Sequence, residues 1–325
     1  MPVHPIRNAF SAVAVLLLAA ACTVKDAEVG PYTVTLIEKN VYHIQDYNTG
    51  NPAGEIFNEY NVRTHFNNCS DIYLLVGQRE ALLIDLSNRI TWADDADASL
   101  RAIIWERAGG KPLTITFTHN HGDHTGMLPA FVNDPGVQFA LPETDFQRLS
   151  ARFPASRQRF INGGDCFDLG GLEVETLEVP GHTPGSMVFS LKGHNLLFSG
   201  DAIGSGHGVW LFDEESFQAF ASSVPHLIEW LGDPARGIDP GQLRIFGGHY
   251  WQRDWLGLPE GQEMGIPYLQ DMIRLIDDIK NGTALQEPSG LQFAVLDTYF
   301  RQGSAIVAWN AAQAEQYSNQ HTQTH

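Results

Sequence analysis

The sequence predicts an α/β (α+β) protein built as a four-layer αββα sandwich, in which two mixed β-sheets pack face to face and helices cover the outside. Two observations lead to this prediction. Short apolar runs that end in polar residues recur along the chain, and longer segments with helical spacing of apolar residues accompany them. No repeat, charge run or low-complexity segment divides the 325 residues, and open α/β layers reach this size. We therefore expect a single domain over residues 31–310.

Five apolar runs are predicted to be strands because each is short and is followed by a polar residue of a metal-binding type or by a turn that presents one. The runs are residues 81–84, 113–117, 172–179, 195–199 and 243–246. The polar residues that follow them are Asp85, His119, His182, Asp201 and His249. Glycines stand beside three of these residues, where the backbone must turn sharply or approach an ion closely.

Four helices are predicted from apolar spacing and boundary residues. They span residues 92–108, which Gly109-Gly110 closes, 142–150, which opens with proline, 214–231, and 266–280, which Asn281-Gly282 stops. Pro225 should kink or interrupt the third helix. Beyond Leu291 the pattern indicates two strands around Gln302-Gly303, and residues 311–325 are expected to form a polar, mobile tail.

The stretch from Thr118 to His124 reads T-H-N-H-G-D-H and offers four metal-binding side chains within six residues. His119 and His121 are two positions apart, so both imidazoles can converge on one ion. Asp123 and His124 then point towards a second ion. Imidazole and carboxylate together suit zinc, and to a lesser degree iron or manganese. So dense a set of ligands predicts two metal ions per chain.

With the later His182, Asp201 and His249, this pattern resembles the metallo-β-lactamase-fold hydrolase superfamily over about residues 41–251. The resemblance implies a two-metal centre with the following ligands: His119, His121 and His182 on one ion, Asp123, His124 and His249 on the other, and Asp201 as the bridge. Asp85 is expected to hold the ligand loops by hydrogen bonding rather than to bind metal. Zinc β-lactamases of the commonest subclass place a cysteine where this chain has Asp201, and the carboxylate is similar to that of glyoxalase-II-like thioesterases and lactonases.

The predicted function is that of an exported, binuclear zinc hydrolase of an acyl bond in a lactone, ester or thioester. Metal ions lower the pKa of bound water from about 15.7 towards 7 and so provide hydroxide near neutral pH. Asp123 is the predicted catalytic residue, because it is placed to orient this hydroxide and to relay a proton. The G-x-S-x-G turn of serine hydrolases is absent from the sequence. The alternatives are a β-lactam hydrolase, a persulfide dioxygenase that uses one iron, and a binding protein that keeps its metal without turnover.

Specificity for a small-molecule substrate is predicted to lie in segments that add to the minimal framework. The insertion at about residues 45–71 is rich in turns and aromatic residues, and we interpret it as a substrate lid. The predicted substrate contacts are Tyr60, Phe66, His207, Trp210, Tyr250 and Trp251. Plain packing is the alternative for each aromatic residue, and a flexible surface loop is the alternative for His207.

The amino terminus predicts export. His4 and Arg7 precede the apolar run from Ala9 to Ala21, which is too short for a membrane span and is followed by Cys22. Residues 1–21 are therefore interpreted as a secretory signal. Cleavage before Cys22 would be similar to bacterial lipoprotein processing and would anchor the protein to a membrane by a lipid, with ordinary cleavage after Ala21 as the alternative. We expect a periplasmic or cell-envelope protein.

Two further features limit the possible partners and cross-links. The formal net charge of −18 argues against nucleic-acid partners and disfavours strongly anionic substrates. Apart from Cys22, the chain has Cys69 and Cys166, which could form one disulfide or remain separate thiols.

Overall fold

The computed structural model describes residues 24–45, 56–57, 63–64, 70–204, 208–249, 264–291 and 293–322. The secretory segment expected at residues 1–21 lies outside them, as does most of the expected lid at 45–71. Among the described residues, no helix is both long and apolar enough to cross a membrane.

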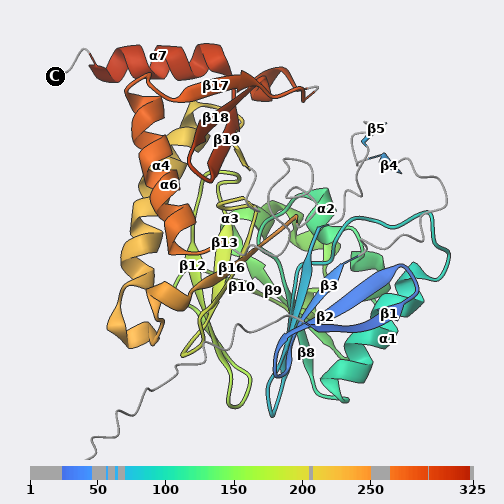
Figure 1. Cartoon of the computed structure of the whole chain (residues 1–325). Helices are drawn as coiled ribbons and strands as arrows, with labels where there is room; N and C mark the ends of the chain where they lie inside the picture. The colour runs from blue at the N-terminus through green and yellow to red at the C-terminus, as the bar shows by residue number, and fades with distance from the viewer. Residues whose placement is uncertain are drawn as a thin grey trace, which may run out of the picture.

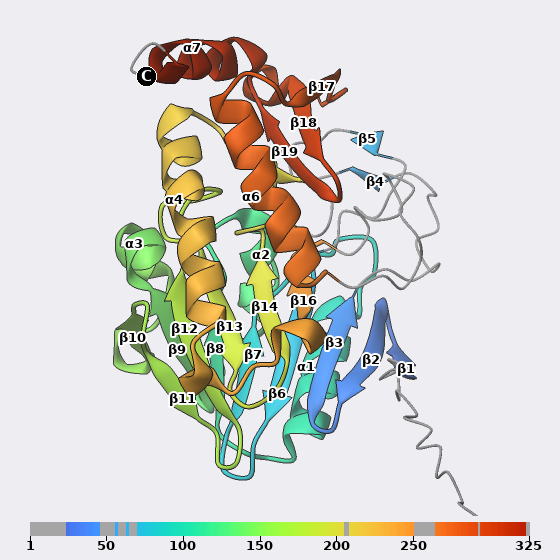
Figure 2. The same cartoon turned by 60° about the vertical axis from the view of Figure 1, so that its left-hand side comes forward.

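Two β-sheets pack face to face at the centre of the structure, and helices cover their outer sides (Figure 1, Figure 2). The first sheet has eight strands in the order β1-β2-β3-β6-β7-β8-β9-β10. Their bounds are β1 (Val24–Val29), β2 (Tyr32–Glu38), β3 (Val41–Gln45), β6 (Ile72–Val76), β7 (Ala81–Ile84), β8 (Leu113–Thr116), β9 (Val137–Pro142) and β10 (Gln158–Ile161). Strands β7 to β10 are parallel to one another and the others are antiparallel, so the sheet is mixed.

The second sheet has five strands in the order β11-β12-β13-β14-β16. Their bounds are β11 (Cys166–Asp168), β12 (Glu173–Glu178), β13 (Met187–Leu191), β14 (Leu196–Gly200) and β16 (Arg244–Gly247). Helix α1 (Ala96–Ala108) packs on the first sheet, and helices α4 (Glu214–Leu231) and α6 (Ile266–Lys280) pack on the second. The predicted four-layer α/β architecture is confirmed.

The all-apolar sequence of β7 follows from burial of the strand on both faces. Leu82 and Ile84 lie in the apolar core between the two sheets, whereas Ala81 and Leu83 pack in the core on the α1 side. Because successive side chains of a strand point to opposite faces, one short run serves both layers. The same double burial makes β7 a fixed support for Asp85, which follows it directly.

Several element boundaries differ from the sequence prediction. Helix α1 begins at Ala96 rather than at residue 92. The segment predicted as a helix at 142–150 is a single turn, α3 (Glu143–Phe146), followed by a 3₁₀ segment, Gln147–Arg152. Pro225 was predicted to kink or interrupt its helix, and the interruption was wrong, since α4 continues through it. Proline removes one backbone hydrogen bond from the helix. Burial of the apolar face of α4 against the second sheet stabilises the helix by more than this loss.

The carboxyl-terminal region adds a third sheet above the sandwich (Figure 1). Its strands, in the order β15-β19-β18-β17, are β15 (Val209–Trp210), β19 (Ala305–Trp309), β18 (Thr298–Gln302) and β17 (Leu285–Pro288). The two strands predicted around Gln302-Gly303 are confirmed as the β18–β19 hairpin. The remaining short elements are β4 (Ile56–Phe57), β5 (Arg63–Thr64), α2 (Gly122–Thr125) and the 3₁₀ segments Leu128–Ala130, Ala155–Arg157, Pro234–Arg236, Pro240–Gln242 and Ala294–Leu296.

The prediction of a mobile tail was wrong for residues 311–322, which form helix α7 (Ala311–Thr322). Distant residues fix this helix. The Ala311 amide donates to Asp297, and the Tyr317 ring lies 5.0 Å from that of Phe217 in α4. The helix is thus stabilised by packing that its own polar sequence does not reveal.

Candidate metal centre

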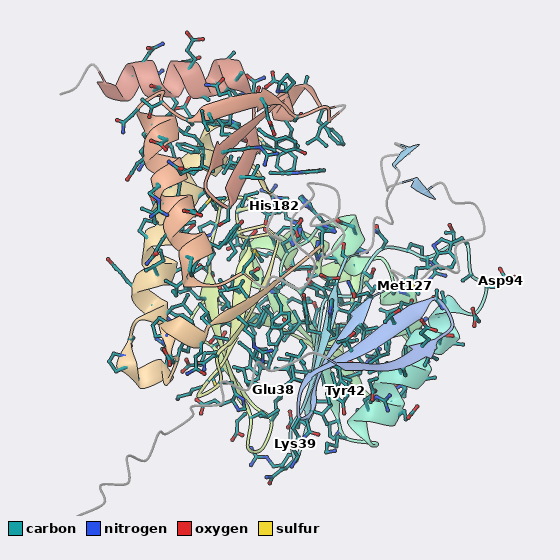
Figure 3. All side chains as sticks on the ribbon, viewed as in Figure 1. Glu38, Lys39, Tyr42, Asp94, Met127 and His182 are labelled. Atoms are coloured by element: carbon teal, nitrogen blue, oxygen red, sulfur yellow. The ribbon has the colours of Figure 1, made fainter. Side chains whose placement is uncertain are left out.

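The predicted ligands meet where strands of both large sheets end. The first sheet contributes the loop after β8, which carries His119 and His121 and continues into α2 with Asp123 and His124. The second sheet contributes His182 from the β12–β13 connection, Asp201 after β14 and His249 after β16. Strands β14 and β16 are parallel neighbours, so Asp201 and His249 leave the sheet at the same edge. His182 lies between this edge and the third sheet (Figure 3).

The structure places the seven residues in two groups. The three-histidine group consists of His119, His121 and His182, and the mixed group consists of Asp123, His124, Asp201 and His249. Within each group the potential ligand atoms all lie within 4.8 Å of one another. Each group therefore has the donor types and the convergence that a zinc ion requires.

One carboxylate faces both groups. Asp201 Oδ2 lies 3.2 Å from His249 Nε2 and 3.6 Å from His182 Nε2. Its other oxygen, Oδ1, lies 3.5 Å from His124 Nε2. Asp201 thus lies between the two groups, within 3.6 Å of histidines of both.

Four of the five histidines are anchored through Nδ1, which leaves Nε2 pointing into the centre. His182 Nδ1 donates to the Trp210 carbonyl at 3.0 Å, and His124 Nδ1 donates to Asp85 at 2.9 Å. His119 Nδ1 lies 3.1 Å from Thr118 Oγ1, and His249 Nδ1 lies 3.4 Å from Ser70 Oγ. A partner on one ring nitrogen fixes the tautomer that presents the other nitrogen to a metal.

His121 is oriented the other way round. Its Nδ1 lies 3.0 Å from His182 Nε2, so Nδ1 is the nitrogen that faces the three-histidine group. Because His182 Nδ1 donates to the Trp210 carbonyl, its Nε2 is an acceptor, and His121 Nδ1 can donate to it as one neutral imidazole to another. A cation bound between the two nitrogens would instead take a lone pair from each of them.

Buried polar atoms without hydrogen-bond partners are a second reason to expect metal ions at these residues. Within the described part of the chain, His119 Nε2, His124 Nε2 and Asp201 Oδ1 are buried and have no hydrogen-bond partner. Buried polar groups are nearly always satisfied, and an unsatisfied group costs about 1–3 kcal/mol. His119 belongs to the three-histidine group, and His124 and Asp201 belong to the mixed group, so each group has a buried polar atom that a bound cation would satisfy.

The three-histidine group is held neutral. Burial is the largest cause and lowers the pKa of His182 to about 4, with the neighbouring His121 adding to the effect. Burial likewise lowers the pKa of His119, and that of His121. Neutral imidazoles are the form that binds metal, so this group needs no proton release near neutral pH.

The mixed group attracts positive charge. Burial opposes protonation of His124, but Asp123, Asp201 and Asp85 raise its pKa well above the usual value. Burial also opposes protonation of His249, but Asp201 and Asp123 raise its pKa well above the usual value. Carboxylates that hold imidazoles in the cationic form provide the negative potential that a divalent ion requires.

Asp85 lies where the sequence prediction placed it, beside the ligands but outside both groups. Its Oδ1 accepts from the Thr118 amide at 2.7 Å, and its Oδ2 accepts from Thr118 Oγ1 at 2.7 Å and from His124 Nδ1. Asp85 itself has a left-handed backbone with φ of 63°. Asp85 therefore holds both ends of the ligand loop, Thr118 at its start and His124 at its end.

Asp145 does the same for the three-histidine group, and sequence reasoning missed it. Its Oδ2 accepts from Thr183 Oγ1 at 2.8 Å and from the Asn120 amide at 3.1 Å, and its Oδ1 accepts from the Gly185 amide at 2.8 Å. These partners flank His121 and His182. A single aspartate in the one-turn helix α3 gives no sequence pattern that would have identified it.

Replacing Asp145 with alanine is expected to lower zinc affinity of the three-histidine group by about 10–100-fold, because outer partners of this kind orient the ligands. Competition with a chromophoric chelator would measure the two zinc affinities separately. Asp134→Ala serves as the matched control, since Asp134 pairs with Arg101 and belongs to neither group of ligands. Equal affinities in the wild type and the Asp145 variant would contradict the role.

Three residues near the start of β6, which the sequence prediction did not include, support the mixed group. Ser70 Oγ lies 3.4 Å from Asp123 Oδ2 as well as from His249. The neighbouring Asp71 donates its amide to the Gly248 carbonyl at 2.6 Å, and Tyr73 Oη donates to the Gly247 carbonyl at 2.6 Å. The start of β6 thus fixes the turn that carries His249.

The glycine at position 248 is required by close approach. A Cβ there would lie 2.2 Å from Asp201 Oδ1 and 2.8 Å from His124 Cε1. No side chain fits without displacing a ligand, which agrees with the expectation that glycines beside the ligands permit a close approach.

The predicted substrate contacts are only partly described. Trp210 lies beside the three-histidine group, but its ring packs against Phe293, 5.9 Å away between centroids. The other predicted contacts lie outside the described residues: Tyr60, Phe66, His207, Tyr250 and Trp251. Cys69 lies outside as well, and Cys166 is an exposed free thiol.

Curated relatives of the chain include enzymes of different chemistry. The chain is 29% identical over 237 residues to a mitochondrial persulfide dioxygenase of Bos taurus, a match that covers 70% of this chain and 82% of the relative. It is 28% identical over 174 residues to an atrochrysone carboxyl ACP thioesterase of Aspergillus chevalieri, covering 52% of this chain and 51% of the relative. A hydroxyacylglutathione hydrolase of Photorhabdus laumondii is 29% identical over 146 residues, covering 43% of this chain and 53% of the relative.

Solved structures show the same fold. The metallo-beta-lactamase from Pontibacter korlensis superimposes with a TM-score of 0.53 at 18% identity, covering 76% of this chain and 99% of that chain. The family model of the metallo-beta-lactamase superfamily matches residues 70–261, which is more than half of the 325 residues and includes all seven predicted ligands. The chain therefore belongs to the metallo-beta-lactamase superfamily.

Proposed function

We propose that the protein is a binuclear zinc hydrolase that cleaves an acyl bond in a lactone, ester or thioester. The position of Asp201 carries this proposal, because one carboxylate oxygen within 3.6 Å of both His182 and His249 suits a pair of ions rather than a single ion. The thioesterase and the hydroxyacylglutathione hydrolase among the relatives support the choice of an acyl bond.

The chain's own residues have distinct tasks in such a reaction. His119, His121 and His182 would hold one ion, Asp123, His124 and His249 would hold the other, and Asp201 would lie between them. Two zinc ions bound to these residues would supply hydroxide near neutral pH and would polarise the substrate carbonyl. The ligand loops are preorganised by Asp85 and Asp145, so that little rearrangement is needed when substrate binds.

Asp123 is the candidate for orienting the attacking water. Burial opposes its ionisation, but His124 and His249 keep its pKa below the usual value. The carboxylate therefore stays ionised and can accept a hydrogen bond from the water, whereas its lowered pKa makes it a weak base for the water's proton. Ser70, whose hydroxyl donates to Asp123 Oδ2, steadies the carboxylate in this orientation.

A one-iron persulfide dioxygenase is the second candidate, and the extent of the match to the bovine persulfide dioxygenase favours it. The two candidates differ in their use of the mixed group. A single iron needs only part of the seven ligands, whereas the hydrolase needs both groups. Metal identity and stoichiometry therefore separate them.

Elemental analysis of the purified protein, combined with acid release from lactones, thioesters, esters and β-lactams, tests the proposal. We expect two zinc ions per chain, loss of acid release on treatment with a chelator and recovery on adding zinc. Release from β-lactams alone would identify the β-lactam hydrolase. One iron per chain with no acid release would replace the hydrolase by the dioxygenase.

We also propose export with a lipid anchor on Cys22, which rests on the sequence of residues 1–22. In a bacterial host, the Cys22→Ala variant is expected to move from the membrane fraction to the soluble envelope fraction, because the lipid-bearing residue is lost. Immunoblots of the fractions measure this. An unchanged distribution would favour ordinary cleavage and secretion over the lipid anchor.

A further inference from the structure

The third sheet reaches the metal centre through β15. This two-residue strand pairs with β19, with Val209 opposite Val307 and Trp210 opposite Ala308, and the Leu211 amide donates to the Ala308 carbonyl at 3.0 Å. The Trp210 carbonyl in turn accepts from His182 Nδ1. Strand β19 lies beyond the residues that the family model matches.

Four large apolar side chains continue from the three-histidine group to this sheet, and we call them the apolar wall: Trp210, Phe212, Leu291 and Phe293. The Phe212 ring lies 5.7 Å from that of His182 and 6.0 Å from that of His121. Buried residues of the third sheet and the adjoining 3₁₀ segment support the wall from behind. Each of the four side chains remains partly exposed.

We propose that the apolar wall receives the acyl group of the substrate, so that the enzyme prefers a long aliphatic or aromatic acyl group. This inference rests on the proposed acyl hydrolysis. A carbonyl that reacts between the two groups of ligands places its acyl substituent beside them, and Phe212 is the apolar residue that contacts two of the ligand rings. An apolar substituent can continue from there along Trp210 and Phe293.

Physical chemistry favours such an occupant over a charged one. Partly exposed aromatic side chains gain free energy when an apolar ligand covers them, and ligand sites are typically lined by such side chains. The formal charge of −18 opposes a strongly anionic substituent. A neutral apolar acyl chain is not repelled by this charge.

The kinetic test compares p-nitrophenyl octanoate with p-nitrophenyl acetate, which share a leaving group. Each methylene removed from water contributes roughly fourfold to binding, so contact with only a few methylenes gives a clear preference for octanoate. We expect Phe293→Ala to lower the octanoate-to-acetate ratio of kcat/KM by about tenfold, and Phe293→Leu to restore most of it. Phe160→Ala is the control, since Phe160 is an exposed aromatic residue on β10.

A binding test is independent of turnover. Titration calorimetry of the zinc-loaded protein with octanoate and with acetate should show tighter binding of octanoate, and this preference should shrink in Phe293→Ala but not in Phe160→Ala. Absence of ester hydrolysis together with selective octanoate binding would reject the proposed function and keep the apolar site. Equal binding of both acids, or an unchanged preference in Phe293→Ala, would overturn the inference even if the wild type hydrolyses esters.

Discussion

Acyl hydrolysis is expected to fall by on the order of a thousandfold when Asp201 is replaced by asparagine, since metal ions contribute several kcal/mol to transition-state stabilisation. The amide keeps the shape of the carboxylate but removes its charge. Asp201 uses both of its oxygens, Oδ1 towards His124 and Oδ2 towards His182 and His249, and the amide leaves only one oxygen, which is uncharged. Bound zinc should fall below two ions per chain, which elemental analysis after dialysis measures alongside the rate.

Asp168→Asn is the matched control for this variant. Asp168 is an exposed carboxylate that pairs with Arg79 at the surface, and such pairs contribute little to stability. The control should keep both the zinc content and the rate of the wild type. If Asp201→Asn kept two zinc ions and full activity, the two-metal mechanism would be refuted.

The second large effect concerns stability as well as activity. Asp85→Ala leaves the Thr118 amide, the Thr118 hydroxyl and His124 Nδ1 without their acceptor. An unsatisfied buried group costs about 1–3 kcal/mol, so we expect the free energy of unfolding to fall by about 3 kcal/mol or more. Alanine is also disfavoured at the left-handed backbone of this position, where φ is 63°. Urea unfolding of the zinc-free protein measures the loss.

Asp85→Asn provides the comparison if the alanine variant does not fold. Asparagine tolerates the left-handed backbone and keeps one acceptor oxygen, so it should lose less stability than alanine. Zinc affinity of the mixed group should still fall by about 10–100-fold, because His124 is less firmly oriented. If both variants retained wild-type stability and zinc affinity, Asp85 would have no role in holding the ligand loop.

The seven predicted ligand positions come together in the structure because strands of the two large sheets end at the same place. Asp201 and His249 illustrate this, since they follow the parallel neighbours β14 and β16. The supporting residues could not be predicted in the same way. Asp145 reaches partners that are 25 to 40 positions away, and no local pattern records such a contact.

The same reasoning explains the errors in the fold. Helix α7 was predicted as a mobile tail because its sequence is polar, whereas its formation depends on Asp297 and on the ring of Phe217. Pro225 was expected to kink or interrupt α4, and the helix is not interrupted because burial of its apolar face outweighs the hydrogen bond that proline removes. In both cases tertiary packing decided the outcome, and single-sequence patterns carry little information about it.

The predicted ligands come from both halves of the sandwich, so metal ions bound to them would also hold the two halves together. His119, His121 and His124 follow β8 of the first sheet, whereas His182 and His249 belong to the second. An ion that binds such a set connects the two halves. At a free concentration of 100 times its Kd, the ion stabilises the folded state by about 2.7 kcal/mol. Loss of zinc should therefore let the two sheets part more readily at this edge, so that the enzyme's lifetime as well as its catalysis depends on the supply of metal.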